Sequence, residues 1–333
     1  MKKKICLAAA GLLAVSAFAG CGTAQEETTL TPVRLNEVVH SVFYAPQYVA
    51  LEMGFFEEEG LDVTVAIGNG ADKSMTALLS DSADIALLGT EAGIYVYNEG
   101  KADYPKAFAQ LTQRAGNFLV SRQEEPDFAW TDLKGKSVIG GRLGGMPELI
   151  LEYVIKENGM TIGEDMEIIN NIDFSSTAGA FTGNVGDYTA EFEPVATTLE
   201  QSGAGYIVAS LGEASGYVPY TVYMARDDFM TEHPEIIEAF TRAIYRGQKW
   251  VAEHSSLEIA ETVLPQFPDS DAETLATIIE RYKAQDTWKT DPAFSEEGFT
   301  LIQDIMEAGG ELSQRVPFDA LVRTDFAEKI MAE

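Results

Sequence analysis

Hydrophobic and polar residues follow two alternating spacings along the first third of the chain. At the strand spacing, apolar residues recur at every second position or form a short unbroken run; at the helix spacing they recur three and four positions apart. The predicted strands are residues 33–39, 61–67 and 83–88, and the predicted helices are residues 45–53, 72–79 and 91–98. Three strand–helix units in about 70 residues predict a mostly parallel sheet with helices on both faces.

A second alternating block occupies the middle of the chain, and the remainder is helical. Its predicted strands are residues 136–141, 167–170, 188–192 and 205–209, and its predicted helices are residues 147–157, 177–182 and 195–201. From Pro234 onward the spacing is helical alone, with predicted helices near residues 234–254, 256–264, 271–285 and 296–308. Two apolar extended runs, 117–121 and 219–224, separate the blocks, and we expect them to be strands that cross between two lobes.

This order of elements predicts an α/β protein with two lobes and a ligand cleft between them. The first lobe combines residues 32–118 with the helical segment 222–333, and the second lobe is residues 119–221. Open α/β sheets bind ligands at the carboxyl ends of their strands, where the connecting loops meet. We therefore expect the binding residues in the loops that follow the predicted strands.

The N-terminus has the parts of a bacterial secretory signal. Three lysines precede residues 5–19, which are uncharged and are too few for a membrane span of about 20 residues. Small residues directly before Cys21 resemble the lipobox of bacterial lipoproteins, which implies a cleaved signal peptide at residues 1–20 and lipidation of Cys21. An ordinary secretory signal with an incidental cysteine is the alternative. The polar segment 21–31 predicts a flexible tether.

Composition narrows the chemistry of the folded body. Cys6 lies in the predicted signal and Cys21 at its end, so we expect no disulfide, cysteine metal cluster or thiol nucleophile in the body. The formal net charge of −30 repels nucleic acid and anionic lipid head groups, so we expect neither as a partner. Acidic surfaces also serve solubility, and the total charge leaves the charge of the ligand open.

The sequence lacks the common catalytic patterns. It contains neither the His-Glu-x-x-His metal motif nor the Gly-x-Ser-x-Gly nucleophile motif, and His40, His233 and His254 are far apart. We therefore expect no enzymatic activity, no metal and no cofactor. A binding protein and a ligand-loaded surface sensor or adhesin both fit these features, and a neighbouring permease and ATPase gene would separate them.

Several segments carry a family resemblance, namely residues 43–63, 79–86 and 132–138 together with Glu193-Pro194. They resemble the nitrate/taurine/alkanesulfonate and thiamin-precursor family of solute-binding proteins. The resemblance implies a two-lobe periplasmic-binding-protein (venus-flytrap) fold that closes on a small molecule outside the cell. It also implies a lipid-anchored monomer whose partner is an ABC importer permease with its ATPase. A pyrimidine synthase of the thiamin pathway shares the fold, but it uses clustered cysteines, which this sequence lacks.

The candidate binding residues lie mostly in loops that follow predicted strands. They are His40, Ser41, Tyr44, Asn69, Gly70, Thr90, Glu91, Arg142, Gly144, Gly145, Met146, Glu191, Glu193 and Tyr220. Glycines before a helix start let a ligand approach free backbone N–H groups. Glu191 and Glu193 share one face of a predicted strand. A carboxylate there can accept hydrogen bonds from an amino-heterocycle that stacks on Tyr44 or Tyr220.

Two classes of ligand remain open. We expect first a neutral or cationic heterocycle, such as a pyrimidine or another vitamin precursor, and second a small sulfonate or nitrate-like anion. The thiamin-pyrimidine members of the family carry a histidine near position 44, where this chain has Tyr44. Sulfonate and nitrate binders tend to offer hydroxyl residues in the turn at 144–147, where this chain has none.

Overall fold

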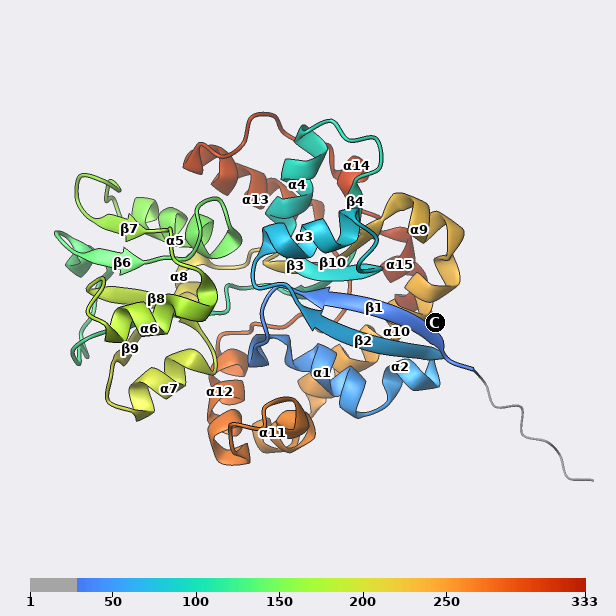
Figure 1. Ribbon diagram of the computed structural model, residues 1–333, viewed down its shortest axis with the longest axis horizontal. Coiled ribbons are helices and arrows are strands. Elements are labelled where there is room, and N and C mark those ends of the chain that lie inside the picture. Colours follow the sequence, from blue (N-terminus) through green and yellow to red (C-terminus); the bar gives the residue numbers. More distant parts are fainter. Residues whose placement is uncertain (1–28) are drawn as a thin grey trace, which may run out of the picture.

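The computed structural model consists of two lobes, each built around one five-stranded sheet with helices on its faces (Figure 1). It describes residues 29–333. The predicted signal peptide, the predicted lipid site at Cys21 and most of the predicted tether lie outside the described residues. The predicted two-lobe α/β fold is confirmed.

Both sheets mix parallel and antiparallel pairs. The strands are β1 (Thr31–Glu37), β2 (Leu61–Ile67), β3 (Ile85–Gly89), β4 (Pro105–Thr112), β5 (Asn117–Ser121), β6 (Ser137–Ile139), β7 (Glu167–Ile169), β8 (Tyr188–Phe192), β9 (Tyr206–Ser210) and β10 (Thr221–Arg226). The first sheet has the order β2-β1-β3-β10-β4, with β1, β2 and β3 parallel and β10 antiparallel to both neighbours. The second has the order β7-β6-β8-β5-β9, with β5 antiparallel to both neighbours.

The helices agree closely with the sequence pattern. They are α1 (Ala45–Glu52), α2 (Phe55–Glu58), α3 (Ala71–Leu79), α4 (Thr90–Asn98), α5 (Met146–Glu157), α6 (Thr177–Thr182), α7 (Val195–Gln201), α8 (Leu211–Ser215), α9 (Asp227–Glu232), α10 (Pro234–Glu253), α11 (Ser256–Val263), α12 (Ala272–Ala284), α13 (Glu296–Gly309), α14 (Phe318–Leu321) and α15 (Asp325–Met331), with 3-10 turns η1 (Val42–Tyr44), η2 (Trp130–Leu133), η3 (Phe174–Ser176) and η4 (Leu264–Gln266). Every predicted helix is confirmed to within one residue at each end. The helices not predicted are short, because few turns leave little periodicity to detect.

Helices sandwich the first sheet. In Figure 1, α3 and α4 lie above it, and α1 and α10 lie below it. The longest helix, α10, buries one stripe that includes Ile237, Phe240 and Ile244, at the spacing of a single helix face. Gly247 extends this stripe where α10 crosses α1. A Cβ at Gly247 would lie 2.3 Å from the carbonyl oxygen of Pro46, so only glycine permits this close approach.

The two runs expected to be crossovers are regular strands, each within a single sheet. Residues 117–121 form β5 of the second lobe, and residues 219–224 overlap β10 of the first lobe. The chain passes between the lobes just before each strand, at 113–116 and 216–220. A short apolar run also predicts a buried central strand, and both of these strands are paired on two sides.

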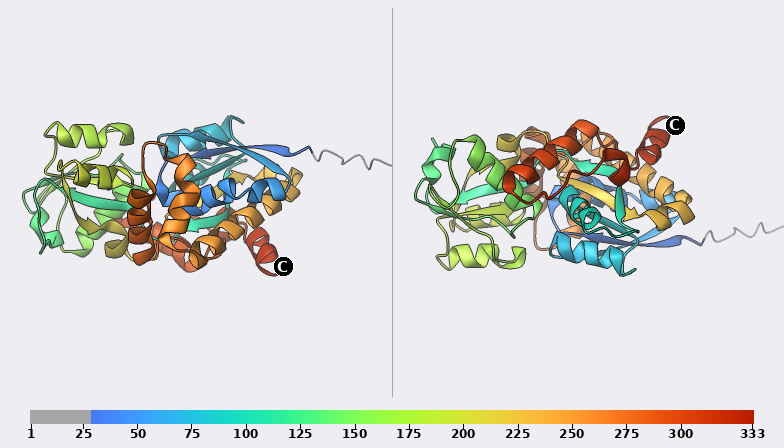
Figure 2. Two further views of the ribbon diagram at one scale, coloured as in Figure 1. Left: turned by 90° about the horizontal axis from the view of Figure 1, so that it is seen from below. Right: turned by 90° about the horizontal axis from the view of Figure 1, so that it is seen from above.

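The helical C-terminal part, which we expected in the first lobe, contacts both lobes. Helix α13 packs against α4 of the first lobe and α5 of the second. From α12, the Tyr282 hydroxyl donates a 2.7 Å hydrogen bond to the carbonyl oxygen of Gly116, at the point where the chain crosses. Figure 2 shows α12 and α13, in orange and red, at the junction of the two lobes.

Candidate functional site

A cavity of about 520 Å³ lies between the two lobes. The first lobe contributes the ends of β1 and β3 with the first turns of α3 and α4. The second contributes the turn before α5 and the end of β8. Small-molecule sites commonly have volumes of about 300–1,000 Å³ and lie at such strand ends. Both the position and the size of this cavity suit a small ligand.

Aromatic side chains form much of the cavity wall. Tyr44, Phe192 and Tyr220 line it, together with the rings of Phe174 and Tyr95. Phe43 packs against the first three, with ring centroids 5.3 Å from Tyr44, 5.6 Å from Phe192 and 5.5 Å from Tyr220. The buried hydroxyl of Tyr220 has no hydrogen-bond partner among the described residues. Flat rings of this kind can stack on a planar ligand while a hydroxyl orients it.

Glu91 places a buried carboxylate in the wall of the same cavity. The side chain lies in the first turn of α4 and is 1% exposed. Its Oε1 accepts a 3.2 Å hydrogen bond from the backbone N–H of Met146 in the other lobe, and its Oε2 has no partner among residues 29–333. Burial raises the pKa of Glu91 to about 7, although the backbone N–H groups of Glu91, Met146 and Ala92 oppose this shift.

Further contacts join the lobes beside the cavity. Arg142 of the second lobe lies with Nη1 3.1 Å from Oδ1 of Asp72 and 3.8 Å from Oδ1 of Asp173. Because Asp72 belongs to the first lobe, the first of these pairs crosses the cleft. The Tyr95 hydroxyl also crosses it and donates to the carbonyl oxygen of Gly144 at 2.9 Å. These contacts hold the lobes together over the cavity.

Acidic groups outnumber basic groups around the cavity. The acidic lining residues are Asp72, Glu91, Glu99 and Glu311, and the basic ones are Lys101 and Arg142. Arg142 faces the carboxylates of Asp72 and Asp173, and their negative charges offset its attraction for an anion.

The structure separates the candidate residues into two groups. Those that line the cavity are Tyr44, Gly70, Glu91, Arg142, Gly144, Gly145, Met146 and Tyr220. Those that do not line it are His40, Ser41, Asn69, Thr90, Glu191 and Glu193. Except for Asn69, each polar side chain of the second group is bonded to another part of the fold. Asn69 directly precedes Gly70 and has a left-handed backbone, with φ of 57°.

His40, Ser41 and Thr90 link segments of the fold instead of facing the cavity. The His40 ring bonds Glu37 through Nδ1 at 2.8 Å and the carbonyl oxygen of Gln266 through Nε2 at 2.9 Å. The Ser41 hydroxyl donates to the backbone carbonyl oxygen of Glu193 in the second lobe at 2.5 Å. Thr90 Oγ1 donates to the carbonyl oxygen of Pro219 at 2.9 Å. In this structure none of the three lines the cavity, and each polar side chain has a partner within the fold.

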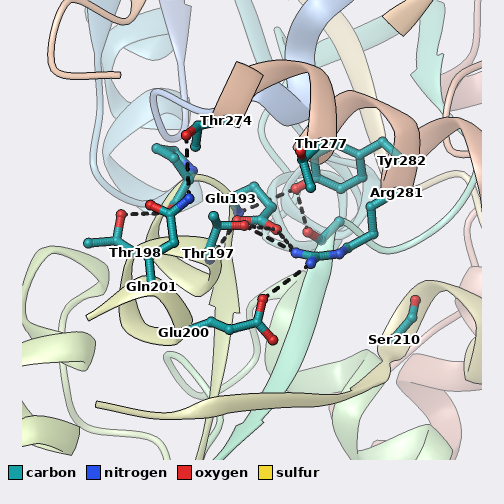
Figure 3. Close-up of polar contacts among 12 residues, drawn as sticks. Glu193, Thr197, Thr198, Glu200, Gln201, Ser210, Thr274, Thr277, Arg281 and Tyr282 are labelled. Atoms are coloured by element: carbon teal, nitrogen blue, oxygen red, sulfur yellow. Dashed lines mark hydrogen bonds and ion pairs between the residues drawn. The ribbon is translucent and has the colours of Figure 1, made fainter. Parts of the chain in front are cut away.

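Glu191 of β8 and Glu193, which directly follows that strand, also have structural roles, and Figure 3 shows the contacts of Glu193. Glu193 pairs with Arg281 of α12 and accepts hydrogen bonds from the backbone N–H and hydroxyl of Thr197, both at 2.9 Å. Glu191 accepts from the hydroxyls of Thr177 at 2.9 Å and Thr189 at 2.6 Å. The alternation expected along this segment places the two glutamates and Phe192 on opposite faces. The intervening Phe192 faces the cavity, and the two glutamates do not line it.

Several lining residues were not predicted. Tyr95 lies four positions after Glu91, so helical spacing alone could have placed it on the same face of α4. Phe192 could have been found by reversing the assumed face of β8. Met75 and Phe174 carry no local signal, because tertiary packing brings their segments to the cavity.

The described part of the chain lacks both metal-ligand groups and membrane-spanning helices. Within residues 29–333, no group of three or more His, Cys, Asp or Glu side chains is arranged to hold a metal ion. None of the helices in this range combines the length and the apolar character that crossing a bilayer requires.

Two α/β lobes with a ligand-sized cavity between them are the architecture of the periplasmic-binding-protein fold. The chain belongs to the family described as "NMT1/THI5 like", whose model matches residues 42–256. It is 45% identical over 317 residues to "Putative binding protein YtlA" of Bacillus subtilis (strain 168), a match that covers 95% of this chain and 94% of that protein.

More distant relatives have names that state a ligand. The chain is 24% identical over 340 residues to the "Formylaminopyrimidine-binding protein" of Halalkalibacterium halodurans, covering 88% of this chain and 97% of that protein. Its fold is similar to that of the alkanesulfonate-binding protein SsuA from Xanthomonas axonopodis pv. citri bound to MOPS. For that structure the TM-score is 0.71 and the identity 15%, over 88% of this chain and 98% of the other. The family match and the 45% identical relative thus place this chain among binding proteins of this family.

Proposed function

We propose that this protein captures a neutral or cationic nitrogen heterocycle, of the pyrimidine or vitamin-precursor kind, outside the cell. The lobes close over the molecule, and the closed protein delivers it to the permease and ATPase of an ABC importer. A lipid on Cys21 holds the protein at the membrane, with residues 21–31 as the tether. The proposed activity is ligand binding alone, without a catalysed reaction.

One observation carries this proposal, namely a cavity that combines aromatic rings with a buried carboxylate. The rings of Tyr44, Phe192 and Tyr220 suit a planar ligand, and the carboxylate of Glu91 suits a ligand with N–H groups. The acidic excess around the cavity acts in the same direction. The relative named for binding a formylaminopyrimidine supports this ligand class.

A small sulfonate or nitrate-like anion is the second candidate. The fold similarity to an alkanesulfonate-binding protein and the presence of Lys101 and Arg142 in the lining favour it. Against it, Arg142 is paired with Asp72, and the turn at residues 144–147 offers no hydroxyl group. An anion would also have to approach the buried carboxylate of Glu91, which repels it when ionised.

Mass spectrometry of protein purified from its own cells, in mild detergent, tests the ligand and the anchor together. Under native conditions we expect a bound small molecule whose mass, after release by denaturation, matches a nitrogen heterocycle. In a digest we expect the N-terminal peptide to begin at an acylated Cys21. A released sulfonate would contradict the ligand class, and an unmodified Cys21 or an intact residue 1–20 segment would contradict the anchor.

A further inference from the structure

The carboxylate of Glu91 lies at the N-terminal ends of two helices that belong to different lobes. Its own helix, α4, begins at Thr90, and α5 of the second lobe begins at Met146, whose N–H donates to Oε1 at 3.2 Å. Helix N-termini carry unsatisfied N–H groups and a partial positive charge, and they attract anions. A bound oxyanion is a common occupant of such a place. Here the protein supplies the anion itself.

The backbone leaves a space for this carboxylate. Gly89 ends β3 directly before α4, and a Cβ at this position would lie 2.0 Å from Oε2 and 2.6 Å from Oε1 of Glu91. Any other residue at position 89 would push the carboxylate away. The glycine therefore allows Glu91 to fold back over the start of its own helix, where it is 1% exposed.

The free oxygen sets Glu91 apart from the other buried glutamates of residues 29–333, which are Glu37, Glu148, Glu191 and Glu193. In each of those side chains, both carboxylate oxygens accept hydrogen bonds within the protein. In Glu91 only Oε1 does so. A buried oxygen without a partner is rare in folded proteins and calls for an explanation. Glu91 is also the one among these five that lines the cavity.

We infer that Glu91 selects the ligand, by accepting at Oε2 a hydrogen bond from an N–H group of an amino-heterocycle or amidine and by occupying the place where an oxyanion would bind. This inference rests on the proposed function, because it takes the cavity as the ligand site. The second unpartnered polar group in the wall, the Tyr220 hydroxyl, offers the ligand a further hydrogen bond. The raised pKa of Glu91, caused by burial, is consistent with a carboxylate that lacks a partner until the ligand arrives.

The same carboxylate couples ligand recognition to the contact between lobes. Oε1 holds the N-terminus of α5, and Oε2 is left for the ligand. A ligand that fixes the Glu91 side chain therefore also stabilises its bond to Met146 across the cleft. Ligand selection and lobe closure thus depend on the same side chain. A ligand without an N–H donor neither bonds Oε2 nor stabilises the contact between Glu91 and Met146.

Calorimetry with two small probes tests the inference. The probes are 4-amino-2-methylpyrimidine, which offers N–H groups, and ethanesulfonate, in phosphate buffer that contains no sulfonate. The variants are Glu91→Gln and its matched control Glu191→Gln, because burial raises the pKa of both glutamates to about 7 but only Glu91 lines the cavity. We expect Glu91→Gln to weaken aminopyrimidine binding by about ten- to 150-fold. Glu191→Gln should stay within twofold of the unmodified protein.

The outcomes separate this inference from the proposed function. If the unmodified protein binds the aminopyrimidine and Glu91→Gln binds it within twofold, the inference is wrong and the proposed function stands. No binding of the aminopyrimidine at millimolar concentration also overturns the inference. Ethanesulfonate binding in its place overturns the proposed ligand class as well. Thermal unfolding verifies that each variant folds. If Glu91→Gln does not fold, Glu91→Asp, which withdraws the oxygen by one methylene, takes its place.

Discussion

At the scale of single residues, Glu91 illustrates how a binding site opposes stability. The side chain is buried, and one of its oxygens lacks a hydrogen bond among the described residues. Removing a carboxylate from water without full compensation raises the free energy of the folded state. The protein tolerates this because an oxygen already satisfied within the fold could not select a ligand.

The pH dependence of unfolding should reveal this cost. The folded pKa of Glu91 is raised from 4.5 to about 7, so the folded state holds more protons between these values and loses stability as the pH rises through them. Without ligand, Glu91→Gln should therefore exceed the unmodified protein in unfolding free energy by on the order of 3 kcal/mol above pH 7. The difference should vanish toward pH 4.5.

Urea unfolding at pH 5 and pH 8 measures this difference, with Glu261→Gln at an exposed position of α11 as the control for the change of side chain. An equal difference between Glu91→Gln and the unmodified protein at both pH values would show that Glu91 is not the group responsible.

At the scale of secondary-structure elements, α12 holds the region where the chain crosses between the lobes. Arg281 pairs with Glu193 of the second lobe (Figure 3). The hydroxyl of the adjacent Tyr282 donates to the carbonyl oxygen of Gly116 in the crossing segment. One turn later, the Gln285 side chain donates to the carbonyl oxygen of Ala115 at 3.0 Å. The last turn of a helix thus fixes both the second lobe and the segment about which it would move.

Breaking the Arg281–Glu193 pair should be strongly destabilising. The Glu193 side chain is fully buried, so Arg281→Met leaves a carboxylate without its positive partner, a change that typically costs about 3–5 kcal/mol. Adding Glu193→Gln to Arg281→Met should recover part of the loss. Glu200 contacts the same arginine at 3.5 Å but is partly exposed, so Glu200→Gln should cost less than about 1 kcal/mol.

A double-mutant cycle by urea unfolding gives the coupling energy. Simple additivity of the two substitutions would mean that the pair contributes nothing specific to the position of α12.

At the scale of the whole molecule, contacts on opposite sides of the cavity have different roles. The crossing segments and α12 join the lobes through the chain itself and through Tyr282, whereas Arg142–Asp72, Tyr95–Gly144 and Glu91–Met146 join them across the cleft through polar contacts alone. A two-lobe protein that signals loading must be able to open and close at modest energetic cost. The polar contacts across the cleft suit such an equilibrium, because water can replace them.

Removing these polar contacts should open the empty protein. We expect Arg142→Ala combined with Tyr95→Phe to give a larger radius of gyration by small-angle X-ray scattering. Saturation with 4-amino-2-methylpyrimidine should compact the unmodified protein more fully than this variant. Arg315→Ala is the matched control, since its partners Asp304 and Glu307 lie together on α13. If the double variant has the same radius as the unmodified protein, and the probe changes neither, closure is contradicted.

Local sequence pattern determined the parts of this protein that depend on neighbouring residues. The helix ends follow from apolar spacing, and the position of the cavity follows from the rule that loops at strand ends bind ligands. Hence Tyr44, Glu91 and the turn at 144–146 could be placed at the cleft from their positions after predicted strands. These features required only that strands and helices alternate along the chain.

Tertiary structure alone decided which polar groups face the ligand. The partners of Glu193 and Glu91 lie 88 and 55 positions away in the chain, at Arg281 and Met146, and no spacing in the sequence indicates either pairing. Strand alternation placed Glu193 and Phe192 on opposite faces but could not say which face turns toward the cavity. Burial and hydrogen bonding arise from segments packed together in space, so they distinguished Glu193, whose two carboxylate oxygens are both bonded, from Glu91, which has one unbonded oxygen.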